Sequence, residues 1–315
     1  MVIGIDLGGM SAKAAVLSDG ELKGKSKVET SAEDTPETTA EKLATLARNV
    51  AEEAGIPFAQ ISAIGIGSPG AIDSKEGVVV SWTNFHWTNV ALAKLVSEHT
   101  KKPVYVLNDA NAAALGEAKF GAGKNYRDSI LVTLGTGVGG GIMIDGKLFE
   151  GNKSVGAEIG HMVIRQNGEL CSCGRRGCFE RYASAKALAR ITRRAMEEDR
   201  TSALWEVAPT LDQAGGRTAF IAQRMGDATA SKVVDEYIAA LGEGLVNLIN
   251  ILRPQAIMIG GGVSNEGENL LVPLREYVRP LVYAYDYAPV EIVRATLGND
   301  AGLYGAAIFA QDKIQ

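Results

Sequence analysis

Short apolar runs, each bounded by glycine or polar residues, open the chain. They predict three successive strands, at residues 2–7, 12–17 and 22–28. Apolar residues then recur at every third or fourth position, which predicts a helix that starts at Pro36, is capped by Thr35 and ends before Gly55. Two more strands and an alanine-rich helix are predicted farther on, at residues 61–66, 104–107 and 110–119. Three strands followed by alternating helices and strands indicate an α/β domain with a mixed sheet.

The same order of elements returns in the middle of the chain. Residues 130–134 form an apolar run that enters the glycine-rich segment 135–141, and strands are predicted at 142–144 and 147–149 on either side of an Asp-Gly turn. The opening of the chain has the same order of strand, glycine turn, strand, Asp-Gly turn and strand. Two similar hairpins could arise by chance, but the shared order favours an internal duplication. We therefore expect two related domains with a cleft between them, a favoured place for a ligand.

The second half of the chain is mainly helical. Helices are predicted at residues 184–197, 233–252 and 301–311, with a strand at 256–259 that leads into a glycine turn. Residues 198–227 are polar and irregular, and no element is assigned to them. The expected division is a small domain at residues 1–109, completed by the closing helix at about 301–315, and a larger domain at 110–300.

Composition places the protein among ordinary globular enzymes. Its 315 residues are 46% hydrophobic and 22% charged, which allows a sizeable core and excludes disordered and fibrous classes. The net charge of −5 and the pI of about 5.4 lack the basic excess of a nucleic-acid-binding protein. No apolar run has the length of a membrane span, and the first residues have the pattern of a strand rather than of a signal segment. We expect a cytoplasmic protein without nucleic-acid or membrane partners.

Glycine is concentrated in turns that follow predicted buried strands. These turns are Gly8-Gly9, Gly135–Gly141 and Gly260–Gly262. Without a Cβ atom such turns let backbone N–H groups approach phosphate oxygens, so three of them favour a phosphate site over merely tight turns. The middle turn matches the spacing of the dinucleotide fingerprint. An extended segment follows it instead of the required helix, however, which excludes a nicotinamide site.

The three cysteines form a cluster. Cys171, Cys173 and Cys178 lie close together, and His161 precedes them. An odd number of clustered thiols does not fit a disulfide framework. Three thiolates and one imidazole make a closed tetrahedral zinc set suited to a structural role. Buried inert thiols are the alternative, but the glycine- and arginine-rich sequence around the cysteines is poor core material.

Polar side chains at two places are candidates for substrate chemistry. Asn108 and Asp109 close an apolar strand and precede a helix, so the pair could cap that helix, present a carboxylate that takes a proton from a substrate hydroxyl, or do both. Glu158 and Glu180 flank the zinc candidate. They could hold a polyhydroxylated ligand or be acids on the surface.

Aromatic residues near Asn84 allow two interpretations. Trp82, His86 and Trp87 could line the face of a sugar or pack in the core. His99, at the polar end of a predicted helix, is expected at the surface.

These motifs resemble those of the ROK family (repressors, open reading frames and sugar kinases), most closely its bacterial ATP-dependent glucokinases. Asp6–Gly9 resembles the first phosphate motif of the family, Leu134–Gly141 the second, and Ile259–Ser264 the adenosine motif. The segments Gly156–His161 and Cys171–Glu180 are similar to its sugar-and-zinc signature, which is the most specific match. The resemblance extends over nearly the whole chain.

The resemblance implies an actin-like (ribonuclease H-like) α/β fold, in which two duplicated domains close on ATP and a sugar. It implies ATP-dependent phosphorylation of a hexose at its 6-hydroxyl, with glucose as the expected substrate, and ATP, Mg²⁺ and structural Zn²⁺ as cofactors. The alternatives are a kinase for another sugar (N-acetylmannosamine, fructose, allose or a β-glucoside) or a sugar-binding regulator without catalysis. A cytoplasmic homodimer that acts in glycolysis is also implied.

The resemblance also assigns roles to single residues. Asp109 is the expected base for the 6-hydroxyl proton. The expected sugar-binding residues are Gly70, Asn84, Asn108, Asp109, Glu158, His161 and Glu180. The expected ATP-binding residues are Asp6, Gly8, Gly9, Gly135, Thr136, Gly137, Gly260, Gly261 and Gly262. The expected zinc ligands are His161, Cys171, Cys173 and Cys178, with the second ring nitrogen of His161 directed toward the sugar. Met10 stands where the family usually has threonine, so one hydroxyl contact to phosphate is lost unless Ser11 supplies it.

Overall fold

The computed structural model describes residues 1–315, which divide into two compact units. Unit 1 consists of Met1–Leu131, Gly141–Ala157 and Thr296–Gln315, and unit 2 consists of Val132–Gly140 and Glu158–Ala295. Both units are therefore built from segments that are distant in the sequence. No helix has the length and apolar character needed to cross a membrane.

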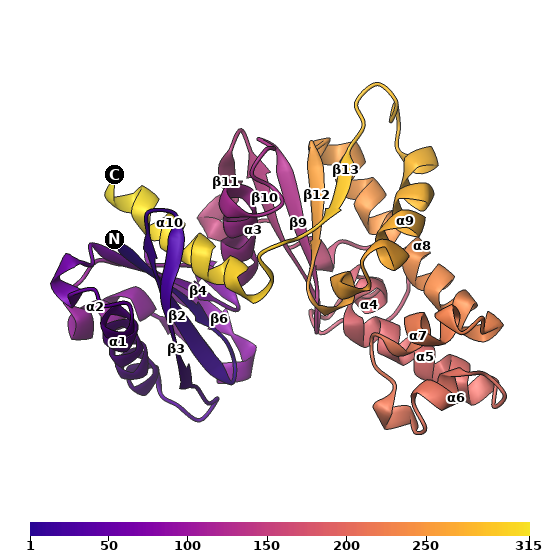
Figure 1. The fold of residues 1–315 in the computed structure, drawn as a ribbon, viewed down its shortest axis with the longest axis horizontal. Coiled ribbons are helices and arrows are strands. Elements are labelled where there is room, and N and C mark those ends of the chain that lie inside the picture. The colour runs from indigo at the N-terminus through magenta and orange to yellow at the C-terminus, as the bar shows by residue number, and fades with distance from the viewer. The chain divides into compact units, whose positions relative to one another are not determined.

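A five-stranded mixed sheet forms the centre of unit 1 (Figure 1). The order is β3-β2-β1-β4-β8, with bounds β1 Val2–Leu7, β2 Ser11–Ser18, β3 Glu21–Glu29, β4 Ala63–Ser68 and β8 Val104–Asn108. Strand β2 is antiparallel to both β1 and β3, whereas β4 is parallel to both β1 and β8. This arrangement confirms the mixed sheet that the apolar runs predict.

Helices cover both faces of this sheet. They are α1 (Pro36–Glu53), α2 (Leu92–Thr100), α3 (Asp109–Phe120) and α10 (Ala301–Ile314). Ile3 and Ile5 of β1 share a hydrophobic cluster with Leu43 of α1. Gly4 between them faces α10, where a Cβ atom would lie 2.0 Å from the carbonyl oxygen of Leu303. Because successive strand residues point to opposite faces, α1 and α10 lie on opposite sides of the sheet.

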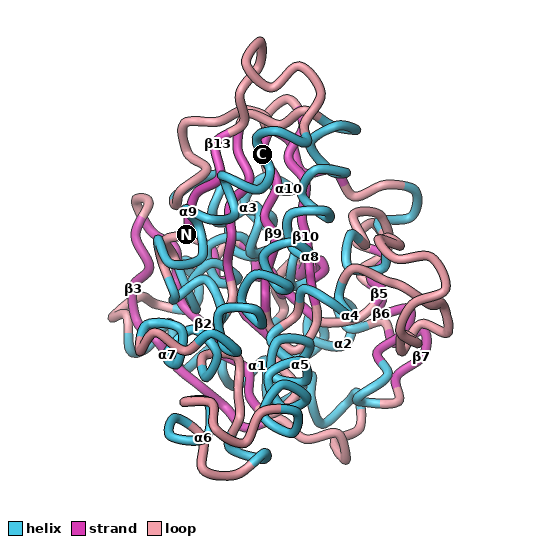
Figure 2. Tube along the Cα trace, turned by 90° about the vertical axis from the view of Figure 1, so that its right-hand side faces the viewer, coloured by secondary structure: helices cyan, strands magenta, loops and turns pink.

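A separate three-stranded sheet also belongs to unit 1. It consists of β5 (Ala71–Asp73), β6 (Val78–Trp82) and β7 (Trp87–Val90), which Figure 2 shows side by side. Trp82 and Phe85 stack with ring centroids 3.8 Å apart, and Trp87 meets both edge-on. All three rings are buried, so these aromatic residues pack in the core rather than line a sugar. His86 is exposed. His99 is exposed as predicted.

The second five-stranded sheet repeats the order of the first. Its order is β11-β10-β9-β12-β13, with bounds β9 Ser129–Leu134, β10 Val138–Ile144, β11 Lys147–Phe149, β12 Ala256–Gly260 and β13 Glu291–Arg294. In both sheets an antiparallel hairpin forms one side and a parallel pair the other. The equal order confirms the internal duplication predicted from the two glycine-turn hairpins. Strand β10 also begins directly after the glycine turn, so the helix that a dinucleotide fingerprint requires is absent.

Helices make up most of the rest of unit 2. They are α4 (Glu180–Ala183), α5 (Ala185–Glu198), α6 (Leu204–Val207), α7 (Thr218–Arg224), α8 (Ala228–Leu252) and α9 (Glu268–Val278). Helices α6 and α7 lie in the segment 198–227, to which the sequence pattern assigns no element. Helix α7 packs on α8, and its Phe220 is fully buried. The segment is thus part of the folded unit.

Candidate functional site

The first glycine turn joins β1 to β2. The N–H of Gly8 donates to the carbonyl oxygen of Ser11 at 3.0 Å, and the hydroxyl of Thr30 donates to the carbonyl oxygen of Gly8 at 2.8 Å. Gly9 is exposed, and so is Met10, with 85% of its surface accessible. Hydrogen bonds therefore hold the base of this turn at Gly8, and its tip is exposed.

Asp6 ends β1 beside this turn. It lies opposite Lys13 in the β1–β2 register and next to Gly302 at the start of α10. Burial raises the pKa of Asp6 to about 6; the charge of Asp109 adds to the rise and that of Lys13 opposes it. The structure thus brings Asp6 and Asp109 together, and two neighbouring carboxylates suit a divalent cation. Lys13 is absent from the sequence-based candidates, although the hairpin register could have identified it.

Asn108 and Asp109 stand where β8 ends and α3 begins. The side-chain oxygen of Asn108 accepts hydrogen bonds from the N–H groups of Ala110 at 2.9 Å and Asn111 at 3.2 Å, so the predicted helix cap is present. Oδ1 of Asp109 accepts a hydrogen bond from Ala110 N–H at 2.8 Å. Burial raises the pKa of Asp109, and the hydrogen bond from Ala110 partly offsets this effect. A carboxylate of raised pKa, fixed at one oxygen, is suited to accept a proton.

Asn108 also binds the segment that precedes β5. Its side-chain amide donates to the carbonyl oxygen of Gly70 at 3.1 Å. Gly70 has φ of +95°, and a Cβ atom there would lie 2.2 Å from the carbonyl oxygen of Ser81, so this position requires glycine. Asn84 is exposed in the short 3₁₀ helix η2 (Thr83–Phe85) and makes no hydrogen bond with Gly70, Asn108 or Asp109.

The second glycine turn, between β9 and β10, belongs to unit 2. The N–H of Gly135 donates to the carbonyl oxygen of Gly137 at 3.0 Å, and Thr136 at the tip is exposed. A Cβ atom on Gly137 would lie 2.6 Å from Oε2 of Glu180. The absence of a side chain therefore lets Glu180 lie directly against the turn.

The third glycine turn follows β12. Gly260 is buried, whereas Gly261 and Gly262 are exposed. A Cβ atom on Gly261 would lie 2.5 Å from the carbonyl oxygen of Leu134, the last residue of β9. The hydroxyl of Ser264 donates back to the carbonyl oxygen of Gly261 at 2.7 Å. The structure thus brings the second and third glycine turns together at the ends of neighbouring strands.

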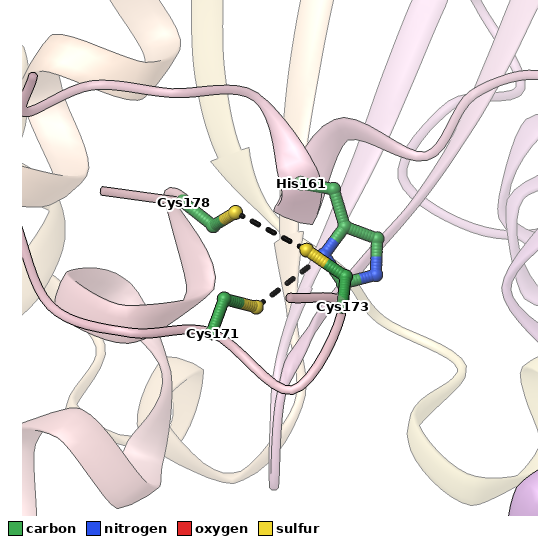
Figure 3. A group of neighbouring side chains, drawn as sticks. All are labelled: His161, Cys171, Cys173 and Cys178. Atoms are coloured by element: carbon green, nitrogen blue, oxygen red, sulfur yellow. Dashed lines mark hydrogen bonds between the residues drawn. The ribbon is translucent and has the colours of Figure 1, made fainter. Parts of the chain in front are cut away.

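The three cysteines and His161 form a compact group of donors. Their potential ligand atoms all lie within 4.8 Å of one another, and Figure 3 shows the four side chains directed toward a common point. The distance from Cys173 Sγ to Cys178 Sγ is 3.6 Å, and that from Cys171 Sγ to His161 Nδ1 is 3.7 Å. A tetrahedral zinc ion places two sulfur ligands about 3.8 Å apart and sulfur and nitrogen ligands about 3.6 Å apart. The donor set and its spacing therefore fit zinc.

The thiols differ in acidity. Burial raises the pKa of Cys171 and brings that of Cys178 to about 12, whereas the backbone N–H of Arg175 lowers the pKa of Cys173. Thiolate is the form that binds a metal, so a metal ion has to displace protons from the two buried thiols.

The two candidate acids near the cysteines have different surroundings. Glu180 begins α4, and its Oε1 accepts hydrogen bonds from Cys171 Sγ at 3.0 Å and from the hydroxyl of Ser172 at 3.4 Å. The same oxygen lies 4.0 Å from His161 Nδ1. Glu158 is exposed at the start of the 3₁₀ helix η4 (Ile159–His161), and its carbonyl oxygen accepts the N–H of His161. Glu180 thus connects the Cys/His group to the second glycine turn.

Each unit carries chemistry of its own kind. Unit 1 has a glycine turn beside two carboxylates of raised pKa, and unit 2 has two adjacent glycine turns next to a metal-binding set. Glycine turns suit phosphate groups, and a basic carboxylate suits an alcohol. Two sheets of equal order with these turns define the class of the protein, an actin-like α/β fold of the sugar-kinase type.

Comparison with known proteins gives the family. The chain belongs to the ROK family, whose model matches residues 2–313. It is 37% identical over 315 residues to a glucokinase of Thermotoga maritima, covering 99% of this chain and 98% of the other. The structure of a ROK family glucokinase from Streptomyces griseus in complex with glucose and AMPPNP is similar, with a TM-score of 0.83, 37% identity and 99% of each chain covered. A xylose repressor of Caldicellulosiruptor bescii is 35% identical over 248 residues, which cover 78% of this chain and 61% of the repressor.

Proposed function

We propose that the protein transfers the γ-phosphoryl group of ATP to the 6-hydroxyl of glucose. The similarity to glucokinases over nearly the full length of both chains supports this substrate pair. The observation that carries the proposal is the position of Asp109. It is a carboxylate of raised pKa at the carboxyl end of a parallel strand, near a glycine turn of the same unit.

Asp109 acts as the general base. Its Oδ1 is occupied by the N–H of Ala110, so Oδ2 is the oxygen that receives the proton of the sugar hydroxyl. As that proton moves to Asp109, the hydroxyl oxygen bonds to the γ-phosphorus, and ADP leaves with the electron pair of the broken P–O bond. Asn108 keeps the base in place, because it caps α3 and binds Gly70 at the same time.

The glycine turns and Asp6 hold the nucleotide. The phosphates bind at the turns Gly8-Gly9 and Gly135–Gly137 through the backbone N–H groups of Gly9, Thr136 and Gly137, because those of Gly8 and Gly135 already donate within their turns. The adenosine binds near Gly260–Gly262. Asp6 would hold the Mg²⁺ that accompanies ATP, and the positive charge of that ion would offset the repulsion between Asp6 and Asp109. The sugar hydroxyls bind to the remaining candidates, namely Asn84, Glu158, His161 and Glu180.

His161, Cys171, Cys173 and Cys178 would hold a structural zinc ion, which would fix the loop that carries them. His161 would bind this ion through Nδ1, which faces Cys171 Sγ, and its Nε2 would remain for a sugar hydroxyl. The protein is a homodimer in this proposal, which sedimentation analysis of the purified chain tests directly.

A coupled assay of ADP release with Mg-ATP and a panel of hexoses tests the function. We expect turnover on glucose, a loss of turnover by a factor of about 10² to 10⁴ in Asp109→Asn, and retained binding of glucose and ATP by that variant. Asp212→Asn is the matched control, since Asp212 is exposed in unit 2 and has no place in the mechanism. Turnover on another hexose but not on glucose would identify that hexose as the substrate and leave the proposed mechanism unchanged. The absence of turnover on every hexose, with sugar still bound, would contradict the kinase assignment.

A further inference from the structure

Three glycines of unit 2 combine an ordinary backbone conformation with open space where a side chain would stand. Most glycines of this chain either have positive φ or lie where a Cβ atom would collide with a neighbour. At Gly135, Gly215 and Gly262 the backbone conformation is ordinary, and no atom lies within 4 Å of the position of a Cβ atom. Glycine lowers stability in such places, because it adds conformational freedom to the unfolded chain. A ligand that must approach the backbone closely would account for all three.

Two of these glycines already belong to the proposed nucleotide site. Gly135 lies in the second glycine turn, and Gly262 lies in the third. Gly215 belongs to the segment 198–227, which neither the sequence motifs nor the proposed mechanism uses.

Contacts inside unit 2 attach the Gly215 segment to the second glycine turn. A Cβ atom on the adjacent Gly216 would lie 3.5 Å from the Cβ atom of Ala185. The N–H of Ala185 in turn donates to the carbonyl oxygen of Gly135 at 2.9 Å. A single residue, Ala185, therefore contacts both Gly216, the neighbour of Gly215, and the second glycine turn, which is proposed to bind phosphate.

Two arginines of the segment 198–227 pair with a buried carboxylate that follows the third turn. Glu266 is the last residue of the 3₁₀ helix η6 (Gly262–Glu266), and its side chain is only 3% exposed. It accepts hydrogen bonds from Arg217 Nε at 3.3 Å and from Arg224 Nη1 at 2.8 Å. A buried carboxylate with two arginine partners fixes the segment firmly, whereas the Arg217 side chain is itself 71% exposed.

The hydrogen bonds of Gly215 indicate which part of a nucleotide it would meet. Its N–H donates to the hydroxyl of Thr218 at 3.0 Å, and its carbonyl oxygen accepts the N–H of Thr218 at 3.3 Å. Because both polar groups are already used, Gly215 cannot serve as an anion nest. It offers a small apolar surface, which suits the flat face of a purine, and the exposed guanidinium of Arg217 is suited to contact an aromatic ring.

We propose that Gly215 packs against the purine base of the bound nucleotide, and that Glu266 positions Gly215 and Arg217 for this contact. The inference rests on the proposed use of ATP and extends it to the recognition of the base.

The test separates the base from the phosphates. Calorimetry measures the Kd of ADP and of inorganic triphosphate for the wild-type chain and for Gly215→Leu. We expect ADP to bind at least about tenfold more weakly to Gly215→Leu, with unchanged triphosphate binding and no drop in melting temperature. In turnover assays KM for ATP should rise while KM for glucose stays constant. Glu266→Gln should also weaken ADP binding, as Gly215→Leu does.

Gly226→Ala is the matched control. Gly226 also faces open space but has φ of +89°, so the added methyl group should lower stability and leave ADP affinity unchanged. Unchanged ADP affinity in Gly215→Leu would overturn the proposal, and so would an equal loss for ADP and triphosphate. If the wild-type chain binds neither ATP nor ADP, the proposed function itself fails, which is a distinct outcome.

Discussion

Replacing Asp6 with asparagine should stabilise the folded chain at neutral and alkaline pH and at the same time reduce ATP-dependent turnover. Burial and the nearby charge of Asp109 raise the pKa of Asp6 from its ordinary 3.8 to about 6. In the unfolded chain the same carboxyl group ionises near its ordinary value. Between these two pH values the folded state binds more protons, so stability falls as the pH rises through this range. The loss of folding stability caused by the ionised carboxylate is complete above the pKa of the folded state. It is absent below the ordinary pKa of the unfolded chain.

The size of the effect follows from the two pKa values. The rise for Asp6 is about two pH units, and each unit corresponds to about 1.4 kcal/mol, so the ionised carboxylate costs roughly 3 kcal/mol. Asparagine has nearly the same shape and carries no charge, so it avoids this cost. The favourable attraction to Lys13, which asparagine also loses, is already included in the pKa.

Chemical unfolding of the wild-type chain and Asp6→Asn, without nucleotide or Mg²⁺, measures the difference. We expect the variant to be more stable by up to about 3 kcal/mol near pH 8, and the advantage to vanish near pH 4. Asp212→Asn, at an exposed position, should show no such pH dependence. An Asp6→Asn variant that is no more stable than wild type near pH 8, or equally more stable at both pH values, would refute the electrostatic argument.

Three further changes test other parts of the structure. Glu117 is buried in α3 and accepts hydrogen bonds from the N–H groups of Ala122, Thr296 and Leu297. Glu117→Ala should therefore lower the free energy of unfolding by at least about 2 kcal/mol in urea titrations, and an unchanged midpoint would contradict this. A Cβ atom on Gly65 would lie 1.8 Å from a carbonyl oxygen of α10, so Gly65→Ala should cost at least about 2 kcal/mol or prevent folding, and a wild-type melting temperature would disprove the close contact. Cys173→Ser should reduce zinc content from about one ion per chain to near zero by atomic absorption, and full retention of zinc would exclude Cys173 as a ligand.

The fold was predictable where the hydrophobic pattern is long or repeated. The opening hairpins, the buried strand at β8 and helices α1 and α8 follow from unbroken apolar periodicity. The duplication was predictable because two hairpins with glycine turns share one order of elements. The sequence-based division at residue 109 stays a prediction.

Several helices and strands that the sequence did not predict lack a long hydrophobic pattern, and the reason can be identified for each. Strands β5 and β13 are only three and four residues long, too short to show alternation. Helix α9 contains Pro273, which interrupts a helical pattern, and α7 has seven residues. These elements exist because neighbours bury them, and a single short segment does not show which neighbours it will have.

The candidate site was predictable as residue types but not as distances. The cysteine spacing predicts a metal-binding set, and the structure brings its four donors together. The electrostatic interaction between Asp6 and Asp109 could be expected only after β1 and β8 were known to end at the same edge of one sheet. The hydrogen bond from Asn108 to Gly70 depends on the path of a loop, which carries no periodic signal.

Glycine illustrates why the remaining information needs a structure. Gly70 is required by its positive φ, and Gly65 by the close approach of α10, so both are explained by folding alone. Gly135, Gly215 and Gly262 satisfy neither requirement, and in the sequence nothing distinguishes them from the first two. A glycine that folding does not require is a candidate for a place where a ligand approaches the backbone, and the proposal for Gly215 uses this reasoning. Gly135 and Gly262 belong to motifs that resemble the family's nucleotide-binding motifs. Gly215 shares their open surroundings, so we expect it to face the same ligand.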